Sequence, residues 1–206
     1  MLFASVDLPS LDKDKATTDI MSLDESLWFW DSYRATSMLP LMTKGASIGA
    51  QGANNRNRQG EFEWVPYAPP SITSWFDDVV FPWMGMKSRV MALKTLPRAA
   101  NHEHIDCDAH KMGTRQHKFR IVIHGRVETL YFMTKQGNVH APDIDGPFIM
   151  DGSWPHGMDN ATDDFKLTLA VGAPWDGRDH YDNINLLLQQ KDYQMPDDFA
   201  KYFMKV

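Results

Sequence analysis

The chain has 206 residues, of which 21 are basic and 27 acidic, giving a formal net charge of −6; this length suits one domain with a substantial core. The negative charge and the absence of a Lys/Arg-rich run argue against a nucleic-acid partner, and no apolar run is long enough to span a membrane. The single cysteine, Cys107, cannot form an internal disulfide and the N-terminus lacks a basic-then-apolar signal, so we expect a cytoplasmic protein whose oligomeric state stays open.

The first sixty residues predict little regular structure. A short extended segment, Leu2–Val6, precedes a charged linker that runs to residue 21. The run Ser22-Leu-Asp-Glu25 is a capping-box signature, which predicts a helix from about Leu23 to Ser37, ended by Pro40. Residues 44–61 are rich in Gly and Asn and lack periodicity, so we expect a long loop, either a mobile segment near an active-site mouth or a disordered one.

A second helix is predicted over Ser71–Val80, with Trp75 and Phe76 facing inward. From Ser88 onward, short apolar segments alternate with Gly, Pro, Asn and Asp clusters, a pattern typical of antiparallel sandwiches and barrels. The predicted strands are Val90–Leu96, His102–Asp106, Phe119–Ile123, Val127–Phe132, Pro147–Met150 and Phe165–Val171.

These elements predict one mainly β domain with flanking helices, built on a double-stranded β-helix or jelly-roll core. We expect an N-terminal helical and loop layer over residues 1–86 and the core over residues 87–175. Residues 176–206 are expected to form C-terminal helices outside the core, at Asp179–Gln190 and Pro196–Lys205.

Two histidines and a carboxylate stand out as candidate metal ligands. His104 and Asp106 are two residues apart, so on a strand they project from the same face and can share one ion. His156 follows a turn-rich segment and leads into a further strand. Two histidines and one carboxylate are the ligand set of the facial-triad non-haem Fe(II) oxygenases, which leaves metal positions open for substrate and oxygen.

The strand after His156 offers groups for an anionic cosubstrate. Phe165–Leu169 alternates apolar and polar residues, so Lys166 and Thr168 face one way and the apolar side chains the other. A cation and a hydroxyl on one side of this strand suit the far carboxylate of a dicarboxylate.

These residues resemble the motif of the Fe(II)/2-oxoglutarate-dependent oxygenases. That motif consists of His-x-Asp, a distal His, a basic residue ten positions after the distal His, and a Ser or Thr two positions after the basic residue. The run is most similar to the aspartyl/asparaginyl β-hydroxylase-like branch, which includes free-proline hydroxylases, and Arg120 matches the strand arginine of that branch. That branch usually carries an arginine ten residues after the distal histidine. This chain has Lys166 there, and lysine is the residue that collagen-type prolyl 4-hydroxylases use at this position. The resemblance covers roughly residues 87–173.

The resemblance implies that His104, Asp106 and His156 bind Fe(II), with 2-oxoglutarate and O2 as cosubstrates. It implies hydroxylation of an unactivated C–H bond of an amino acid, free or peptidyl and of Pro or Asp/Asn type, with succinate and CO2 as coproducts. Lys166, with Thr168, would bind the 5-carboxylate of 2-oxoglutarate, and Arg120 is the rival or second anchor. Asp106 favours hydroxylation, because related halogenases carry a small residue in its place.

Two other interpretations remain open. His102 would share a strand face with His104, and a His102/His104/His156 site would suit a cupin-type metalloenzyme that does not use 2-oxoglutarate. The chain would alternatively be a jelly-roll binding protein without enzymatic activity, whose histidines are incidental. Only the first interpretation requires both a metal and 2-oxoglutarate, with a small amino acid, a peptide or a protein as the partner to be modified.

Overall fold

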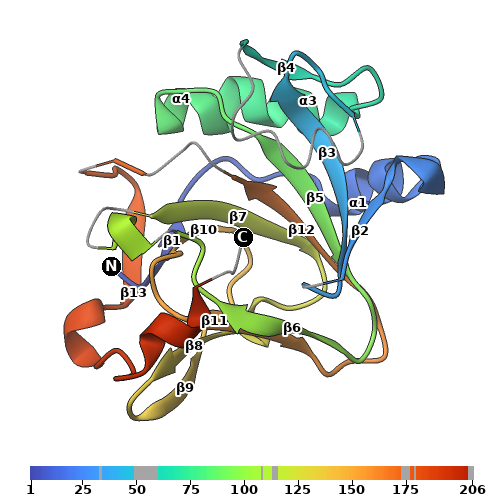
Figure 1. The fold of residues 1–206 in the computed structure, drawn as a ribbon. Helices are drawn as coiled ribbons and strands as arrows, with labels where there is room; N and C mark the ends of the chain where they lie inside the picture. Colours follow the sequence, from blue (N-terminus) through green and yellow to red (C-terminus); the bar gives the residue numbers. More distant parts are fainter. Residues whose placement is uncertain are drawn as a thin grey trace.

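The computed structural model describes residues 1–32, 34–48, 60–107, 109–112, 116–172, 177–178 and 180–203. Within these residues the strands form two antiparallel sheets that lie face to face (Figure 1). The larger has nine strands: β1 (Phe3–Val6), β2 (Phe29–Asp31), β3 (Thr36–Lys44), β4 (Phe62–Trp64), β5 (Val90–Thr95), β7 (His117–His124), β10 (Pro147–Asp151), β12 (Lys166–Val171) and β13 (Ile184–Leu188). The smaller has four: β6 (Ala99–His104), β8 (Leu130–Thr134), β9 (Gly137–His140) and β11 (His156–Asn160).

The order of the strands differs from their order in the chain. The larger sheet runs β13-β1-β10-β7-β12-β5-β3-β2, with β4 paired to β3, and the smaller runs β6-β11-β8-β9. Neighbouring strands are therefore often distant in sequence, as in a jelly roll. The predicted mainly β, double-stranded β-helix fold is confirmed.

Helices cover the outer face of the larger sheet (Figure 1). They are α1 (Lys13–Met21), α3 (Pro70–Trp75), a π-helical turn (Phe76–Val80) and α4 (Phe81–Met84). Short 3-10 turns occupy Glu25–Leu27, Ala109–Lys111, Val127–Thr129, Gln190–Asp192 and Phe199–Tyr202. No helix in the part of the chain that the structure describes is long and apolar enough to cross a membrane.

Successive side chains of β12 point alternately into the hydrophobic core and into a pocket. Leu167 and Leu169 are fully buried in the core beneath the helices, together with Val171. Lys166 and Thr168, on the opposite face, line a pocket between the two sheets. The sequence pattern predicted this division, and the buried outer face fixes which way the two polar side chains point.

The prediction of a helix over Leu23–Ser37 is wrong. The Asp24 carboxylate accepts a hydrogen bond from the Ser26 N–H at 2.8 Å, but this supports only the 3-10 turn, after which β2 and β3 form a hairpin. β3 passes through Pro40, where its pairing register with β5 shifts, because an irregularity accommodates the missing N–H. The charged linker before residue 21 in fact contains α1.

The expected C-terminal helices are also wrong within the described residues, where β13 and two 3-10 turns take their place. β13 pairs with β1, which otherwise would leave an unpaired edge. The second helix, Ser71–Val80, is confirmed as helical, with Trp75 and Phe76 buried. The expected loop over 44–61 falls mostly on residues 49–59, which lie outside the described residues.

Candidate active site

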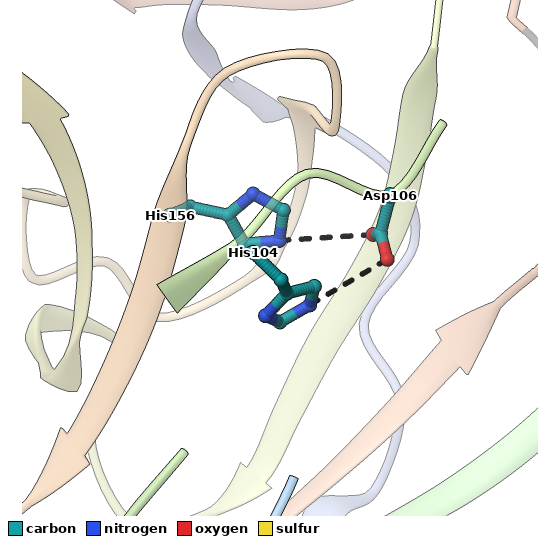
Figure 2. Close-up of side chains that lie close together, drawn as sticks. All are labelled: His104, Asp106 and His156. Atoms are coloured by element: carbon teal, nitrogen blue, oxygen red, sulfur yellow. Dashed lines mark ion pairs between the residues drawn. The ribbon is translucent and has the colours of Figure 1, made fainter. Parts of the chain in front are cut away.

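The three candidate ligands converge at one end of the smaller sheet (Figure 2). β6 ends at His104, β11 begins at His156, and the two residues are paired across the strands. Asp106 is not on the strand with His104 as expected: it lies in the bend that follows, where its N–H donates to the Gly152 carbonyl at 2.8 Å. One ligand atom from each residue lies within 4.8 Å of the others.

Backbone carbonyls orient both imidazoles. Nδ1 of His104 lies 2.8 Å from the His102 carbonyl oxygen, and Nδ1 of His156 lies 2.7 Å from that of Trp154. A carbonyl only accepts, so each Nδ1 carries a proton, and in the neutral imidazole it is Nε2 that keeps the lone pair. Both Nε2 atoms face the Asp106 carboxylate, at 3.6 Å from His104 and 3.7 Å from His156 (Figure 2).

This arrangement fits a bound metal ion. The Nε2 of His156 is buried and has no hydrogen-bond partner within the described structure. A buried acceptor aimed at a carboxylate is costly unless a cation lies between them. The set of two imidazole nitrogens and one carboxylate oxygen, each imidazole fixed through its other nitrogen, matches Fe(II) and the orientation that metal-bound histidines usually have.

Electrostatics keep these side chains in the forms that bind metal. Burial would raise the pKa of Asp106, but its contact with His104 and the positive charge of Lys118 hold the pKa well below its usual range. Burial, followed by the charge of His104, lowers the pKa of His156 to about 3. Asp106 is therefore anionic and His156 neutral near pH 7.

All six residues predicted for the site line one pocket of about 350 Å³ between the sheets: His104, Asp106, Arg120, His156, Lys166 and Thr168. This volume suits a small-molecule site.

Lys166 is 4% exposed, and its Nζ donates a hydrogen bond to Oγ1 of Thr129. Burial, with the nearby charge of Arg120, lowers the pKa of Lys166 to about 7, against the opposing effect of Glu128.

Arg120 projects from β7 into the same pocket. Its Nη2 lies 3.7 Å from the Asp106 carboxylate, and its Nε is buried without a hydrogen-bond partner in the described structure. Burial lowers the pKa of Arg120, and the charge of Arg34 adds to this while Asp106 opposes it.

Three further cations of the pocket lining were not predicted, namely Arg34, Arg89 and Lys118. Lys118 stands two residues before Arg120 on β7, so strand alternation alone would have found it. Arg89 likewise stands two residues before Met91, another lining residue. Arg34 had no such signal, because it follows β2 in a turn and its guanidinium pairs with Asp31 at 2.6 Å.

The three-histidine alternative is not formed. His102 is exposed, and its carbonyl oxygen accepts the hydrogen bond from Nδ1 of His104. Among the described residues, the only group of three or more metal-ligating side chains is His104, Asp106 and His156. Asp151 accepts hydrogen bonds from the Ser153 N–H and hydroxyl, so it stabilises the turn before His156.

No family model matches the sequence, and no curated protein matches it significantly. Among solved structures, OsALKBH1 matches with a TM-score of 0.51 and 10% identity, over 82% of this chain and 96% of that one. A prolyl-4-hydroxylase from Pseudomonas putida matches with a TM-score of 0.47 and 10% identity, over 82% of this chain and 92% of that one. An oxidoreductase of the 2OG-Fe(II) oxygenase family from Burkholderia pseudomallei matches with a TM-score of 0.44 and 14% identity, over 81% and 79%. The likeness to OsALKBH1 is one of fold, and it agrees with the jelly-roll arrangement of the two sheets.

Proposed function

We propose that this protein is an Fe(II)- and 2-oxoglutarate-dependent dioxygenase that hydroxylates an unactivated C–H bond of an amino acid, free or peptidyl and of Pro or Asp/Asn type. One observation carries the proposal. His104, Asp106 and His156 present two Nε2 atoms and a carboxylate toward one point, in a pocket whose opposite wall carries a buried lysine. When bound, Fe(II) with 2-oxoglutarate and O2 would supply the oxidant, and succinate and CO2 would be the coproducts.

The three ligands would occupy one face of the metal and leave the other positions to cosubstrate and oxygen. The carbonyls of residues His102 and Trp154 hold the imidazoles in the tautomer and the orientation that this role requires. Lys118 is 7% exposed, and its positive charge beside Asp106 keeps that carboxylate ionised. The site thus provides one carboxylate and two imidazole groups that are already positioned to bind a metal ion.

Lys166 is the proposed anchor for the distal carboxylate of 2-oxoglutarate. Thr129 already accepts a hydrogen bond from its ammonium group, and Thr168 projects from the same strand face two residues along. Because its pKa is about 7, Lys166 takes up a proton readily when a carboxylate arrives. A charge-assisted hydrogen bond of this kind contributes about 1.5–3 kcal/mol. Arg120 remains the alternative or second anchor.

Binding measurements test this proposal without requiring turnover. The protein is loaded with Mn(II), and 2-oxoglutarate is titrated by calorimetry into the loaded and the metal-free forms. We expect metal-dependent binding in the wild type, and about tenfold or more weaker binding in Lys166→Met. Metal binding without any metal-dependent binding of 2-oxoglutarate would favour the cupin-type alternative. Absence of metal binding would leave a jelly-roll binding protein.

A further inference from the structure

The turn between β10 and β11, residues 152–155, holds two of the three metal ligands through its backbone. The Gly152 carbonyl accepts a hydrogen bond from the Asp106 N–H at 2.8 Å. The Trp154 carbonyl lies 2.7 Å from Nδ1 of His156 and orients the ring. A change in the path of this turn would therefore move the Asp106 carboxylate and rotate the His156 imidazole together.

Gly152 packs directly against the ligand that it holds. A Cβ added at Gly152 would lie 3.0 Å from Cβ of Asp106 and 3.1 Å from Cε of Lys118. The Gly152 N–H also donates to the Gln116 carbonyl at 2.8 Å. Because such close packing leaves little space between the two residues, a displacement of Gly152 must also displace Asp106.

A buried carboxylate shapes this turn. Asp151 ends β10 and is 5% exposed. Its Oδ1 accepts two hydrogen bonds from Ser153, one from the N–H at 2.9 Å and one from the hydroxyl at 2.7 Å. Its Oδ2 accepts a hydrogen bond from the side-chain amide of Gln190. Both oxygens of the carboxylate thus have donors, as a buried carboxylate requires.

Gln190 connects the metal site to a segment that is distant in sequence. It opens the 3-10 turn that follows β13, 39 residues after Asp151. The same C-terminal segment also contacts the loop of another ligand, since the Tyr202 carbonyl accepts a hydrogen bond from the Ile105 N–H at 2.8 Å. Ile105 stands between two of the metal ligands in the chain. The C-terminal segment therefore contacts both loops that carry the ligands.

Building on the metal site of the function proposed above, we propose that Asp151 and Gln190 are positioning residues for the metal centre. Together they hold the turn in the path that keeps Asp106 and His156 aimed at one point. They act through the backbone rather than as ligands. Changes to groups that orient metal ligands typically reduce metal affinity by about 10–100-fold. A contact that only attached the C-terminal segment would change the stability of the protein but leave its metal affinity unchanged.

Titration of the whole chain with Co(II), followed by visible absorption, measures both the metal affinity and the ligand geometry. Gln190→Met removes the amide donor and keeps the length of the side chain. We expect it to bind Co(II) about tenfold more weakly and to show an altered d–d spectrum at saturation. Asp151→Leu should lose more, because the two hydrogen bonds from Ser153 are lost as well.

A conservative exchange should rescue the site. Asp151→Asn keeps an oxygen for the two Ser153 donors, and its amide nitrogen can donate to Gln190 once the glutamine amide turns over. We therefore expect nearly wild-type Co(II) binding. Gln190→Glu alone sets two carboxylates against each other and should weaken binding. The double variant, Asp151→Asn with Gln190→Glu, should recover it, because an amide donor again faces a carboxylate.

Amide hydrogen exchange reports on the turn without any metal. In the metal-free protein the Asp106 N–H is protected by its hydrogen bond to Gly152. We expect this amide to exchange faster in Gln190→Met than in the wild type, because the turn opens more often. An unchanged exchange rate would overturn the inference.

Asp197→Asn is the matched control. It removes the ion pair, 2.5 Å long, by which Asp197 of the same C-terminal segment contacts Lys135 in the turn between β8 and β9. This variant should keep the wild-type Co(II) affinity, spectrum and Asp106 exchange rate. An equal loss of affinity in Asp197→Asn and Gln190→Met would contradict the assigned positions.

The wild-type titration separates this inference from the function on which it rests. A wild type that does not bind Co(II) would remove the metal site itself, and this inference with it. A wild type that binds Co(II), with unchanged affinity and spectrum in both Gln190→Met and Asp151→Leu, would remove only the positioning role.

Discussion

At the scale of single residues, the site depends on which nitrogen of each histidine faces Asp106 and which faces a backbone carbonyl. Residue types and spacing indicated His104, Asp106 and His156, but no sequence pattern specifies that backbone carbonyls accept hydrogen bonds from both Nδ1 atoms. Those hydrogen bonds arise from the backbone path at the end of β6 and the start of β11, which forms only in the folded chain. The grouping of these three side chains was thus predictable, whereas the tautomers of the two histidines were not.

Removing one ligand should weaken metal binding without unfolding the protein. Changes to partners that merely orient a metal ligand typically cost about 10–100-fold in affinity, so His156→Ala should cost at least as much. Titration with Co(II), followed by its visible absorption, measures this loss. His140→Ala, at an exposed histidine on β9, is the matched control and should bind Co(II) as the wild type does. Unchanged Co(II) affinity in His156→Ala would contradict the assigned ligand set.

Lys166 makes stability depend on pH in a defined direction. Its pKa is about 7 in the folded protein and 10.5 in the unfolded chain, so between these values the unfolded state binds the extra proton. The folding stability contributed by this residue therefore rises as pH increases from about 7 toward 10.5, and it falls as pH is lowered from 10.5 to about 7, below which it no longer changes.

Lys166→Met should remove this dependence. Because it replaces a buried charge with an apolar chain of similar size, we expect it to raise the free energy of unfolding at pH 7 by about 1–4 kcal/mol. Urea denaturation at several pH values between 7 and 10 checks both points. A variant less stable than the wild type at pH 7, with the same pH slope, would refute the burial argument.

At the scale of elements, β11 and β8 pack with an aromatic ring over a glycine. Gly157 and Tyr131 are directly paired, and a Cβ on Gly157 would lie 2.6 Å from the tyrosine hydroxyl and 2.7 Å from Cζ. The Tyr131 hydroxyl donates to Glu103 at 3.1 Å, and burial with this carboxylate raises the pKa of Tyr131 to about 12. The ring is thus held in place over Gly157, the residue that follows His156.

Gly157→Ala should therefore destabilise the protein by about 1–3 kcal/mol, the usual cost of overpacking. Gly146→Ala is the control, since an added Cβ there meets nothing within 4 Å. Thermal unfolding of both variants measures the difference. Equal melting temperatures would show that the strand pair accommodates the added methyl group, contrary to this account.

Strands with a buried face could be predicted, and strands defined by distant partners could not. Alternation identified β12 and the direction of Lys166, because one face packs under helices. The run Ile184–Leu188 resembled a helix, since its strand character depends on the edge of β1, far away in sequence. Asp106 was expected on a strand and lies in a bend, because β6 ends at His104.

At the scale of the whole molecule, the N-terminal strand β1 connects the last strand, β13, to the rest of the larger sheet. β1 lies between β10 and β13, and the Phe3 ring stacks on Phe148 with centroids 4.9 Å apart. Phe148 also lines the pocket, so the first residues of the chain support the site. The loss of a fully buried aromatic side chain typically costs about 3–5 kcal/mol.

We therefore expect Phe3→Ala to lower the free energy of unfolding by about 3–5 kcal/mol in urea denaturation. Leu186→Ala, at a side chain that is 46% exposed on β13, should change it little. A loss in Phe3→Ala no larger than in Leu186→Ala would mean that β1 is not part of the cooperative core.

The central claim is that one pocket binds Fe(II) and 2-oxoglutarate together. Its most direct test is anaerobic titration of the purified protein with Fe(II) and then with 2-oxoglutarate, monitored by visible absorption. The account predicts a weak metal-to-ligand charge-transfer band that appears only after both additions, is absent in Asp106→Ala, and requires more 2-oxoglutarate in Lys166→Met. A wild-type protein that retains Fe(II) but develops no band with 2-oxoglutarate would contradict it.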